Sequence, residues 1–298
     1  MTANVNDTAM QPALALKRSE FRRIIRVFFR RKIAVIGFVI IFLFVVMAIF
    51  APYIAPHDPY AFDATKRLQQ PSPGHLLGTD SMGRDTLSRI IYGSRTTLII
   101  GIFAVVVGSA IGQFLGIVSA YFGRKVDTII MRLIDVQLAF PGMILMLLIA
   151  ALLGGGMRNL IIALSISMIP VSCRLMYAEA LSVKQNEYVL AARAIGSGPF
   201  RIIFMRIYPN CFSSQLVLMT IMMGAVILSE AGLSYLGVGV QVPQADWGSM
   251  VNNGYPYLLT NPILSLSPGI AIMLMVFGFN MMGDGLRDAL DPKLRGVI

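Results

Sequence analysis

Charged residues, cysteine and tryptophan are all scarce in this chain. Asp, Glu, Lys and Arg make up only 13% of its 298 residues and hydrophobic residues make up 56%, a composition typical of a membrane protein. The two cysteines, Cys173 and Cys211, provide no disulfide framework, so we expect both to be free thiols. The composition therefore excludes a disulfide-stabilised secreted domain and an ordinary soluble domain.

The motifs of several enzyme classes are absent as well. No GxxxxGK[ST] motif occurs, so the chain lacks the phosphate-binding loop and the lysine that many ATPases use. HExxH and GxSxG, which mark zinc proteases and serine hydrolases, do not occur in its apolar runs. We expect no catalytic residue and no cofactor on this chain, and any ATP would be hydrolysed by another chain.

Histidine occurs only twice, as His57 and His75. Their separation of eighteen positions matches no ligand spacing of a metal-binding motif. The sequence therefore predicts that both histidines serve loop structure and that the chain has no metal site.

Six apolar runs predict the fold class, and they are residues 33–51, 96–119, 136–157, 159–173, 207–229 and 263–283. The first run has nineteen residues without a charge, enough to cross a hydrocarbon core of about 30 Å. The fourth has only fifteen between Arg158 and Arg174, so we expect Arg174 to reach the membrane surface or neighbouring helices to shield the span. We expect an all-α, polytopic membrane protein with six transmembrane helices.

Glycine is concentrated on one face of the second run. Gly108, Gly112 and Gly116 recur every four residues, a spacing that lets membrane helices pack closely. In the third run, Pro141 and Gly142 weaken one helical turn. We therefore expect a tight helix pair along the second run and a local weakness near the start of the third.

Lysine and arginine predict the orientation in the membrane. Nineteen of the 25 fall in segments on the side of the N-terminus and six on the other side, which favours cytoplasmic termini in a bacterial inner membrane. Topology thus accounts for the net charge of +10, and we expect no nucleic-acid partner. The predicted segments are a basic cytoplasmic segment 1–32, a first transmembrane helix 33–51, an outer loop 52–94, a five-helix core 95–284 and a cytoplasmic tail 285–298.

Two acidic residues stand out because they border apolar runs, where ionisable groups are functional candidates. Asp135 lies three positions after Arg132, and we expect an ion pair between them at the membrane surface. Glu230 either hydrogen-bonds backbone at a helix break or lines an outer cavity. An ion pathway through Asp135 and Glu230 would make the chain a secondary transporter or channel, which is the competing function.

A polar, helix-prone segment at residues 177–214 interrupts the apolar runs. Tyr188, Ala191, Ala192 and Ile195 form one apolar stripe of a predicted helix, narrow enough for a partner to approach closely. Gly196 is placed to end this helix in a left-handed conformation.

A second short helix is predicted to follow at residues 200–208. Gly198 and Pro199 are typical of a helix start, with proline in the first turn. The helix is expected to stop before Pro209, because the residue before a proline disfavours helix.

The same segment carries a resemblance. EYVLAARAIG at residues 187–196, followed by Pro209-Asn210, resembles the EAA loop of ABC-importer permeases. The resemblance implies a cytoplasmic coupling helix that docks on an ATP-hydrolysing subunit through Glu187, Tyr188, Ala191, Ala192, Arg193, Gly196 and Pro209. Leu190 before the alanine pair, and Arg206 where an isoleucine is usual, depart from the general pattern and are similar to the dipeptide, oligopeptide and nickel branch.

Three further stretches resemble the same branch. HLLGTDSMGRDTLSRIIYGSRTTL at residues 75–98 is similar to the signature that follows the first span of its C-type permeases, and Pro243 with Trp247-Gly248 and the ending GDGLRDALDP at 283–292 also match. We expect Thr79 and Asp80 to cap a helix, Arg84, Asp85 and Arg89 to pair, and the loop to pack on the outer mouth of a pore. The outer-loop and gate candidates are Asp80, Gly83, Arg84, Asp85, Arg89, Glu230 and Trp247.

Trp247 permits two interpretations, an anchor at the membrane interface or a contact with a docking protein or substrate. The resemblance further implies a second homologous permease, two ATP-binding subunits that carry ATP and Mg, an extracytoplasmic solute-binding protein and surrounding lipid. Dipeptides or oligopeptides are the expected solutes, and glutathione or a nickel chelate are the alternatives.

Overall fold

A computed structural model describes residues 23–290 of the chain. These residues contain no strand, only two isolated bridges, and residues 23–30 are helical. The helices that follow are α2 (Lys32–Ile49), α3 (Ala51–Ile54), α4 (Thr86–Phe122), α5 (Arg124–Leu138), α6 (Gly142–Leu153), α7 (Met157–Lys184), α8 (Glu187–Ala194), α9 (Pro199–Ile202), α10 (Tyr208–Tyr235), α11 (Trp247–Gly254) and α12 (Ile263–Leu290). The all-α prediction is confirmed.

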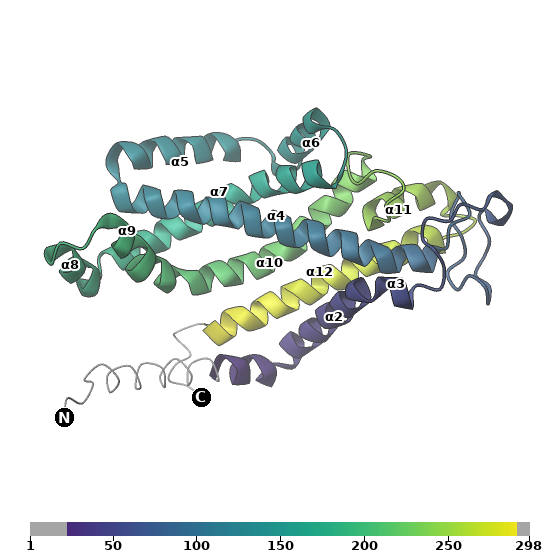
Figure 1. Cartoon of the computed structure of the whole chain (residues 1–298), viewed down its shortest axis with the longest axis horizontal. Helices are drawn as coiled ribbons and strands as arrows, with labels where there is room; N and C mark the ends of the chain where they lie inside the picture. Colours follow the sequence, from purple (N-terminus) through teal and green to yellow (C-terminus); the bar gives the residue numbers. More distant parts are fainter. Residues whose placement is uncertain (1–22, 291–298) are drawn as a thin grey trace, which may run out of the picture.

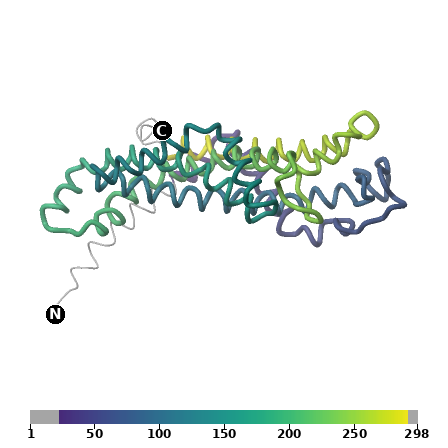
Figure 2. Tube along the Cα trace, turned by 90° about the horizontal axis from the view of Figure 1, so that it is seen from above, coloured from purple at the N-terminus to yellow at the C-terminus, as the bar shows by residue number. Residues whose placement is uncertain are grey.

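The helices form an elongated bundle with two distinct ends (Figures 1 and 2). Helices α8 and α9 lie at one end, which we call the α8 end. Helix α11 and the polar loop that precedes α4 lie at the other, the α11 end. The start of α2 and the end of α12 both point toward the α8 end. Arg31, directly before α2, pairs with Asp288 of α12 at 2.5 Å. The basic residues before position 23 and after position 290 lie outside the described residues.

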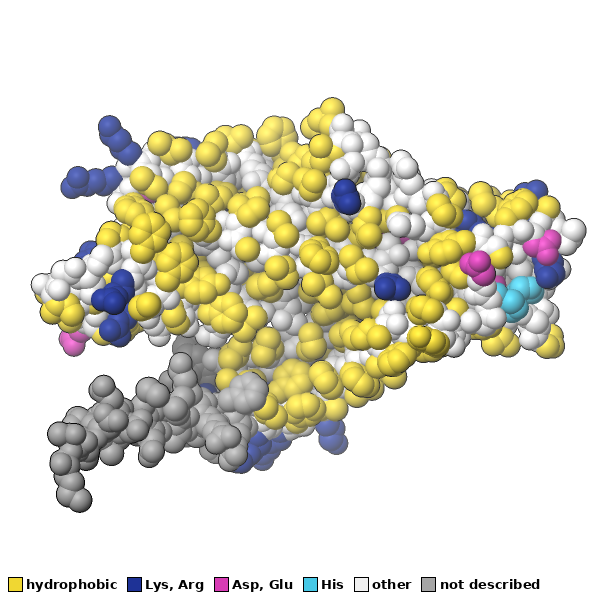
Figure 3. All heavy atoms as spheres, viewed as in Figure 1, with side chains coloured by type: hydrophobic (Ala, Val, Ile, Leu, Met, Phe, Trp, Pro, Cys, Tyr) yellow, Lys and Arg dark blue, Asp and Glu magenta, His cyan; other side chains and the backbone are white. Residues whose placement is uncertain are grey.

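The surface has the character of a membrane protein. On the face drawn in Figure 3, hydrophobic side chains cover the middle of the bundle, and charged side chains gather mainly at its two ends. Among residues 23–290, five helices are long and apolar enough to cross a membrane, and the number is six if the bent pair α5 and α6 counts as one span. The prediction of six spans therefore holds only with that pair included.

The predicted third span is wrong as a single helix. Helices α5 and α6 meet at an angle of 91°, and the break contains Pro141, which precedes the first residue of α6. Proline cannot donate the hydrogen bond that a continuing helix requires, so the chain bends there. The sequence located the weak helical turn at Pro141 and Gly142 correctly, but it did not predict so large a bend.

The predicted short fourth span is also wrong. Helix α7 is 28 residues long, from Met157 to Lys184, and it passes through Arg174 without a break. Arg174 projects from the side of this helix and its Nη2 lies 2.6 Å from Asp135 Oδ1 on α5. Arg174, and not the predicted Arg132, is therefore the partner of Asp135, because the helices fold side by side.

Several predicted boundaries are wrong because the helices extend beyond the apolar segments. Pro209 does not end a helix but lies in the first turn of α10, where its missing N–H is not needed, directly after a π-helical turn at Ile203–Ile207. Helix α4 begins inside the predicted outer loop at Thr86. Helix α12 continues into the predicted tail as far as Leu290.

The predicted glycine face brings α4 against α7. A Cβ atom added at Gly112 would lie 2.6 Å from the carbonyl oxygen of Ile169, and one at Gly108 or Gly116 would collide with the α7 backbone in the same way. Ser172 on α7 donates a hydrogen bond of 3.1 Å to the carbonyl of Ser109 across this contact. The expected close packing is confirmed.

We predict that Gly112→Ala destabilises the protein by about 1 to 3 kcal/mol, because the added methyl group pushes the two backbones apart. Gly269→Ala on α12 is the matched control, since a Cβ there meets no atom within 4 Å. The measurement is the thermal unfolding midpoint of each variant in detergent. Equal midpoints for the two variants would contradict the packing described.

Candidate functional site

The α8 end is fastened to the bundle through the end of α7. Lys184 donates hydrogen bonds of 2.9 Å to the carbonyls of Ala120 and Tyr121, the last turn of α4. A cation at the C-terminal end of a helix is stabilised by the helix dipole. The Tyr121 ring also has Lys184 and Arg193 near it, at 5.8 and 5.1 Å from the ring centre. Helix α8 is thus tied to both α4 and α7.

The apolar stripe of α8 divides into two faces. Val189 and Ala192 are buried in a cluster with side chains of α4, α7 and α9. Tyr188, Ala191 and Ile195 are exposed, and we call these three residues the exposed α8 face. Ala192, predicted to meet a partner, instead packs within its own chain because it lies about 100° around the helix from Ala191.

The turn after α8 has the predicted form. Gly196 has a φ of +77°, a conformation that other residues adopt at a cost. The backbone N–H of Ser197 donates 3.0 Å to the carbonyl of Ala192 and closes the turn. Pro199 then begins α9. A hollow of about 470 Å³ lies along this turn, and its lining residues are Ala192, Ile195, Ser197, Arg201, Ile202, Met205 and Arg206.

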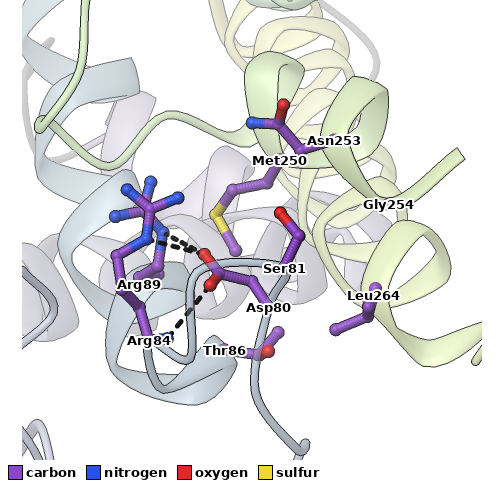
Figure 4. A pocket seen from close by; sticks show the side chains of 9 residues that line it. All are labelled: Asp80, Ser81, Arg84, Thr86, Arg89, Met250, Asn253, Gly254 and Leu264. Atoms are coloured by element: carbon purple, nitrogen blue, oxygen red, sulfur yellow. Dashed lines mark hydrogen bonds and ion pairs between the residues drawn. The ribbon is translucent and has the colours of Figure 1, made fainter. Parts of the chain in front are cut away.

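Asp80 organises the charges at the α11 end (Figure 4). One of its oxygens accepts a 2.7 Å hydrogen bond from Arg84 Nε and lies 3.7 Å from Arg89 Nε, while the other accepts from the backbone N–H of Met82 and Arg84. Gly83 completes the turn with a φ of +76°, and a Cβ there would collide with Asp63. The prediction that Asp85 pairs with the arginines is wrong, because the turn presents Asp80 to them.

Arg89 joins three distant segments. Its Nη1 donates to the carbonyls of Pro59 and Pro243, at 3.1 and 3.4 Å, and its Nη2 donates to Gln244 at 3.5 Å. The residue is almost completely buried, so these carbonyls and Asp80 replace its water shell. Arg89 therefore holds the outer loop and the segment before α11 against the start of α4.

Asp85 caps α4, although the sequence suggested Thr79 and Asp80 for this role. Its Oδ2 accepts hydrogen bonds from the backbone N–H and the hydroxyl of Ser88, at 2.8 and 2.7 Å. Burial alone would raise the pKa of the Asp85 carboxyl, but the hydrogen bonds from Ser88 and His75 outweigh it and hold that pKa below its usual value. Asp85 is therefore a carboxylate at neutral pH.

Trp247 is neither an interfacial anchor nor an exposed contact. Its side chain is 0% exposed, its Nε1 donates 2.9 Å to the carbonyl of Ile90, and its ring fits against Gly93 of α4 and Phe44 of α2. The ring therefore belongs to the hydrophobic core of the bundle. Both interpretations made from the sequence are therefore wrong.

Glu230 lies in the same buried region, with 1% of its surface exposed. Ser234 donates 3.2 Å to its Oε1, while its Oε2 and the Oδ1 of buried Asp246 have no hydrogen-bond partner. Asp246 escaped the sequence analysis, although its position three residues before Ser249, whose N–H it caps at 2.9 Å, was a readable signal. The sequence pattern did not indicate the roles of Lys184 and Tyr121 either, because their contact joins distant helices.

We predict that Asp80→Asn destabilises the protein by about 3 to 5 kcal/mol, since it removes the carboxylate that pairs with the buried guanidinium of Arg84 and lies 3.7 Å from that of Arg89. Asp58→Asn is the control, because Asp58 is exposed in the same loop and its acceptor oxygen is retained. Thermal unfolding in detergent measures both. A tolerated Asp80→Asn would mean that the carbonyl contacts of Arg89 suffice.

The geometry agrees with comparisons to known proteins. Residues 112–296 match the family described as binding-protein-dependent transport system inner membrane component. Residues 19–71 match the N-terminal TM domain of oligopeptide transport permease C. The two matches together leave out residues 1–18, residues 72–111, which contain the outer turn and most of α4, and the last two residues.

Curated relatives cover most of the chain. The dipeptide transport system permease protein DppC of Alkalihalophilus pseudofirmus is 41% identical over 89% of this chain and 88% of its own length. The glutathione transport system permease protein GsiD of Pectobacterium atrosepticum is 40% identical over 93% of each chain. The probable D,D-dipeptide transport system permease protein DdpC of Escherichia coli is 42% identical over 87% of each.

A solved structure supports the fold. A chain from inward-facing crystals of the MetNI methionine ABC transporter superposes with a TM-score of 0.57 at 17% identity, covering 68% of this chain and 97% of that one. At this identity the likeness concerns the fold alone. The curated relatives and the matched family domains go further, and this multi-pass inner membrane protein belongs to the inner membrane components of binding-protein-dependent transport systems, as a C-type permease of the dipeptide and oligopeptide group.

Proposed function

We propose that this chain is one of two homologous permease subunits of an ABC importer that moves dipeptides or oligopeptides into the cell. The partners are a second permease, two ATP-binding subunits and an extracytoplasmic solute-binding protein. The observation that carries the proposal is the exposed α8 face on a helix that is otherwise held firmly. An apolar face at a charged end of the bundle is best explained by a partner that covers it.

The ATP-binding subunits are the proposed partner of α8. The helix presents Tyr188, Ala191 and Ile195 outward, with Glu187 in its first turn and Arg193 in its last. An amphipathic helix of this kind fits into a groove on another protein. ATP and Mg would be bound by those subunits, and we propose no cofactor and no catalysis on this chain.

Helix α4 is the proposed route by which force at α8 reaches the α11 end. Its last turn receives Lys184, and its first turns hold Arg89 and the carbonyl that binds Trp247. A helix of 37 residues is about 55 Å long, so α4 reaches from one end of the bundle to the other without a break. Movement of α8 would therefore tilt α4 and α7 together and change access to the path between the two permeases.

The names of the relatives give weaker support for the class of substrate than for the family. Two of them are named for dipeptide or D,D-dipeptide transport and one for glutathione transport, at nearly the same identity. Glutathione is itself a short peptide, so short peptides are the class that includes all three. Glutathione is the second candidate, and a nickel chelate has no support among these relatives.

We predict that the α8 end faces the cytoplasm. Both native cysteines are buried, so single introduced cysteines report without background. A membrane-impermeant maleimide should label Leu259→Cys, at a position 99% exposed at the α11 end, in cells with a permeabilised outer membrane. Lys125→Cys, at an exposed position at the start of α5 and outside the exposed α8 face, should react only after lysis. Labelling of Lys125→Cys in unlysed cells would reverse the orientation.

We predict that Ala191→Trp lowers uptake by the reconstituted importer by at least about tenfold, equivalent to roughly 1.4 kcal/mol of docking free energy. The indole fills the space that a partner needs while leaving the chain's own packing intact, because Ala191 is exposed. The measurements are labelled dipeptide uptake and co-purification of the ATP-binding subunits. Ala191→Ser, a change of one atom, is the control, and full uptake by Ala191→Trp would refute docking at this face.

A further inference from the structure

The two histidines of the chain meet at the α11 end. His57 and His75 lie in the outer loop, and one ligand atom from each, together with one from Asp85, lie within 4.8 Å of one another. Figure 3 shows histidine side chains at the surface of this end. We propose that His57, His75 and Asp85 form a binding site for a divalent transition-metal ion of the Zn²⁺ type. The site is separate from the exposed α8 face and goes beyond the transport function proposed above.

The two oxygens of Asp85 have separate tasks. Oδ2 is used by Ser88 at the start of α4, as described above. Oδ1 faces both imidazoles, with His75 Nδ1 at 2.9 Å and His57 Nδ1 at 3.8 Å. A metal ion at Oδ1 would therefore leave the helix cap in place.

The spacing suits a small ion. Ligands held about 2.0 to 2.2 Å from a tetrahedral ion lie about 3.3 to 3.6 Å from one another. The distances from Asp85 Oδ1 to the two Nδ1 atoms, 2.9 and 3.8 Å, lie on either side of that range. Small rotations of the two imidazoles would therefore bring both distances into it. The ring centres are 4.6 Å apart and the rings are tilted by 32°. In both rings Nδ1 is the nitrogen that lies beside the shared oxygen.

The surroundings provide both rigidity and access. The Asp85 side chain is 2% exposed and that of His75 is 12% exposed, while His57 is 44% exposed. The backbone N–H of His57 donates 3.0 Å to Ser88 Oγ, which fixes this loop segment beside the cap. The buried pair forms the floor and His57 the open side, where a water molecule would complete the coordination.

The donor set indicates the class of ion. Two imidazole nitrogens and one carboxylate oxygen suit Zn²⁺, Ni²⁺ or Cu²⁺, whereas Mg²⁺ and Ca²⁺ prefer oxygen ligands alone. A bound ion would connect loop positions 57 and 75 to the first residues of α4. It would act as a clamp on the outer loop.

The test follows the reactivity of His57 with diethyl pyrocarbonate, which modifies free imidazole. The full-length chain, purified in detergent on a tag without histidine, is treated with or without Zn²⁺, and the peptide containing His57 is quantified by mass spectrometry. At a Zn²⁺ concentration of about ten times the Kd, modification should slow about tenfold, because only one site in eleven is then free. Cys173 and Cys211 are buried and do not compete for the ion.

His75→Gln separates a metal site from a purely structural cluster. Its amide retains a hydrogen-bond donor for Asp85 and removes one metal ligand, so protection of His57 by Zn²⁺ should disappear. If this variant fails to fold, His57→Ala at the exposed position is used in its place, and the unfolding midpoint is measured with and without Zn²⁺. The midpoint of the wild type should rise with Zn²⁺, and that of His57→Ala should not. No protection of the wild type at millimolar Zn²⁺, equal protection in His75→Gln, or equal protection by Mg²⁺ would each overturn the proposal.

Discussion

The close approach of α4 and α7 is the contact on which the rest of the structure depends. Three glycines of α4 allow the backbones to touch, and no side chain on that face separates the helices. Without a hydrophobic effect between helices in lipid, such packing is a main source of cohesion. Because α7 ends at Lys184 and α4 at Phe122, the same contact fixes where α8 leaves the bundle. The position of the exposed α8 face is thus a consequence of glycines located about 9 to 21 Å back along α4 from its last residue.

The α11 end follows a different principle, the pairing of buried charge. Arg84 and Arg89 are almost fully buried, and a buried guanidinium is tolerated only with hydrogen-bond acceptors and a counter-charge around it. Asp80 and the carbonyls of Pro59, Pro243 and Gln244 supply these. The outer loop, the segment before α11 and the start of α4 must therefore stay together, since opening any one exposes an unpaired charge to an apolar surface.

The sequence predicted features that depend on local chemistry and missed those that depend on distant contacts. The helical class, the glycine face and the left-handed Gly196 follow from residue type and spacing within a few turns. The burial of Trp247, the partner of Asp135 and the meeting of His57 with His75 join elements far apart in the sequence, and no local pattern encodes them. Pro209 shows that even a local signal can be ambiguous. Proline can mark the end of a helix or occupy its first turn, depending on whether a helix follows.

The two ends together suggest where the molecule can bend. The α11 end is closed by buried charge pairs, and the backbones of α4 and α7 are packed directly against each other, so we expect both regions to resist a displacement applied at α8. The joint between α5 and α6 is different, because it turns by 91° at Pro141 and its flanking residues Phe140 and Met143 are exposed. Few buried contacts hold it, and segments of that kind have the lowest cost of deformation. In the proposed coupling, a displacement at α8 would reach the α11 end through α4, and the joint between α5 and α6 would be the part that yields.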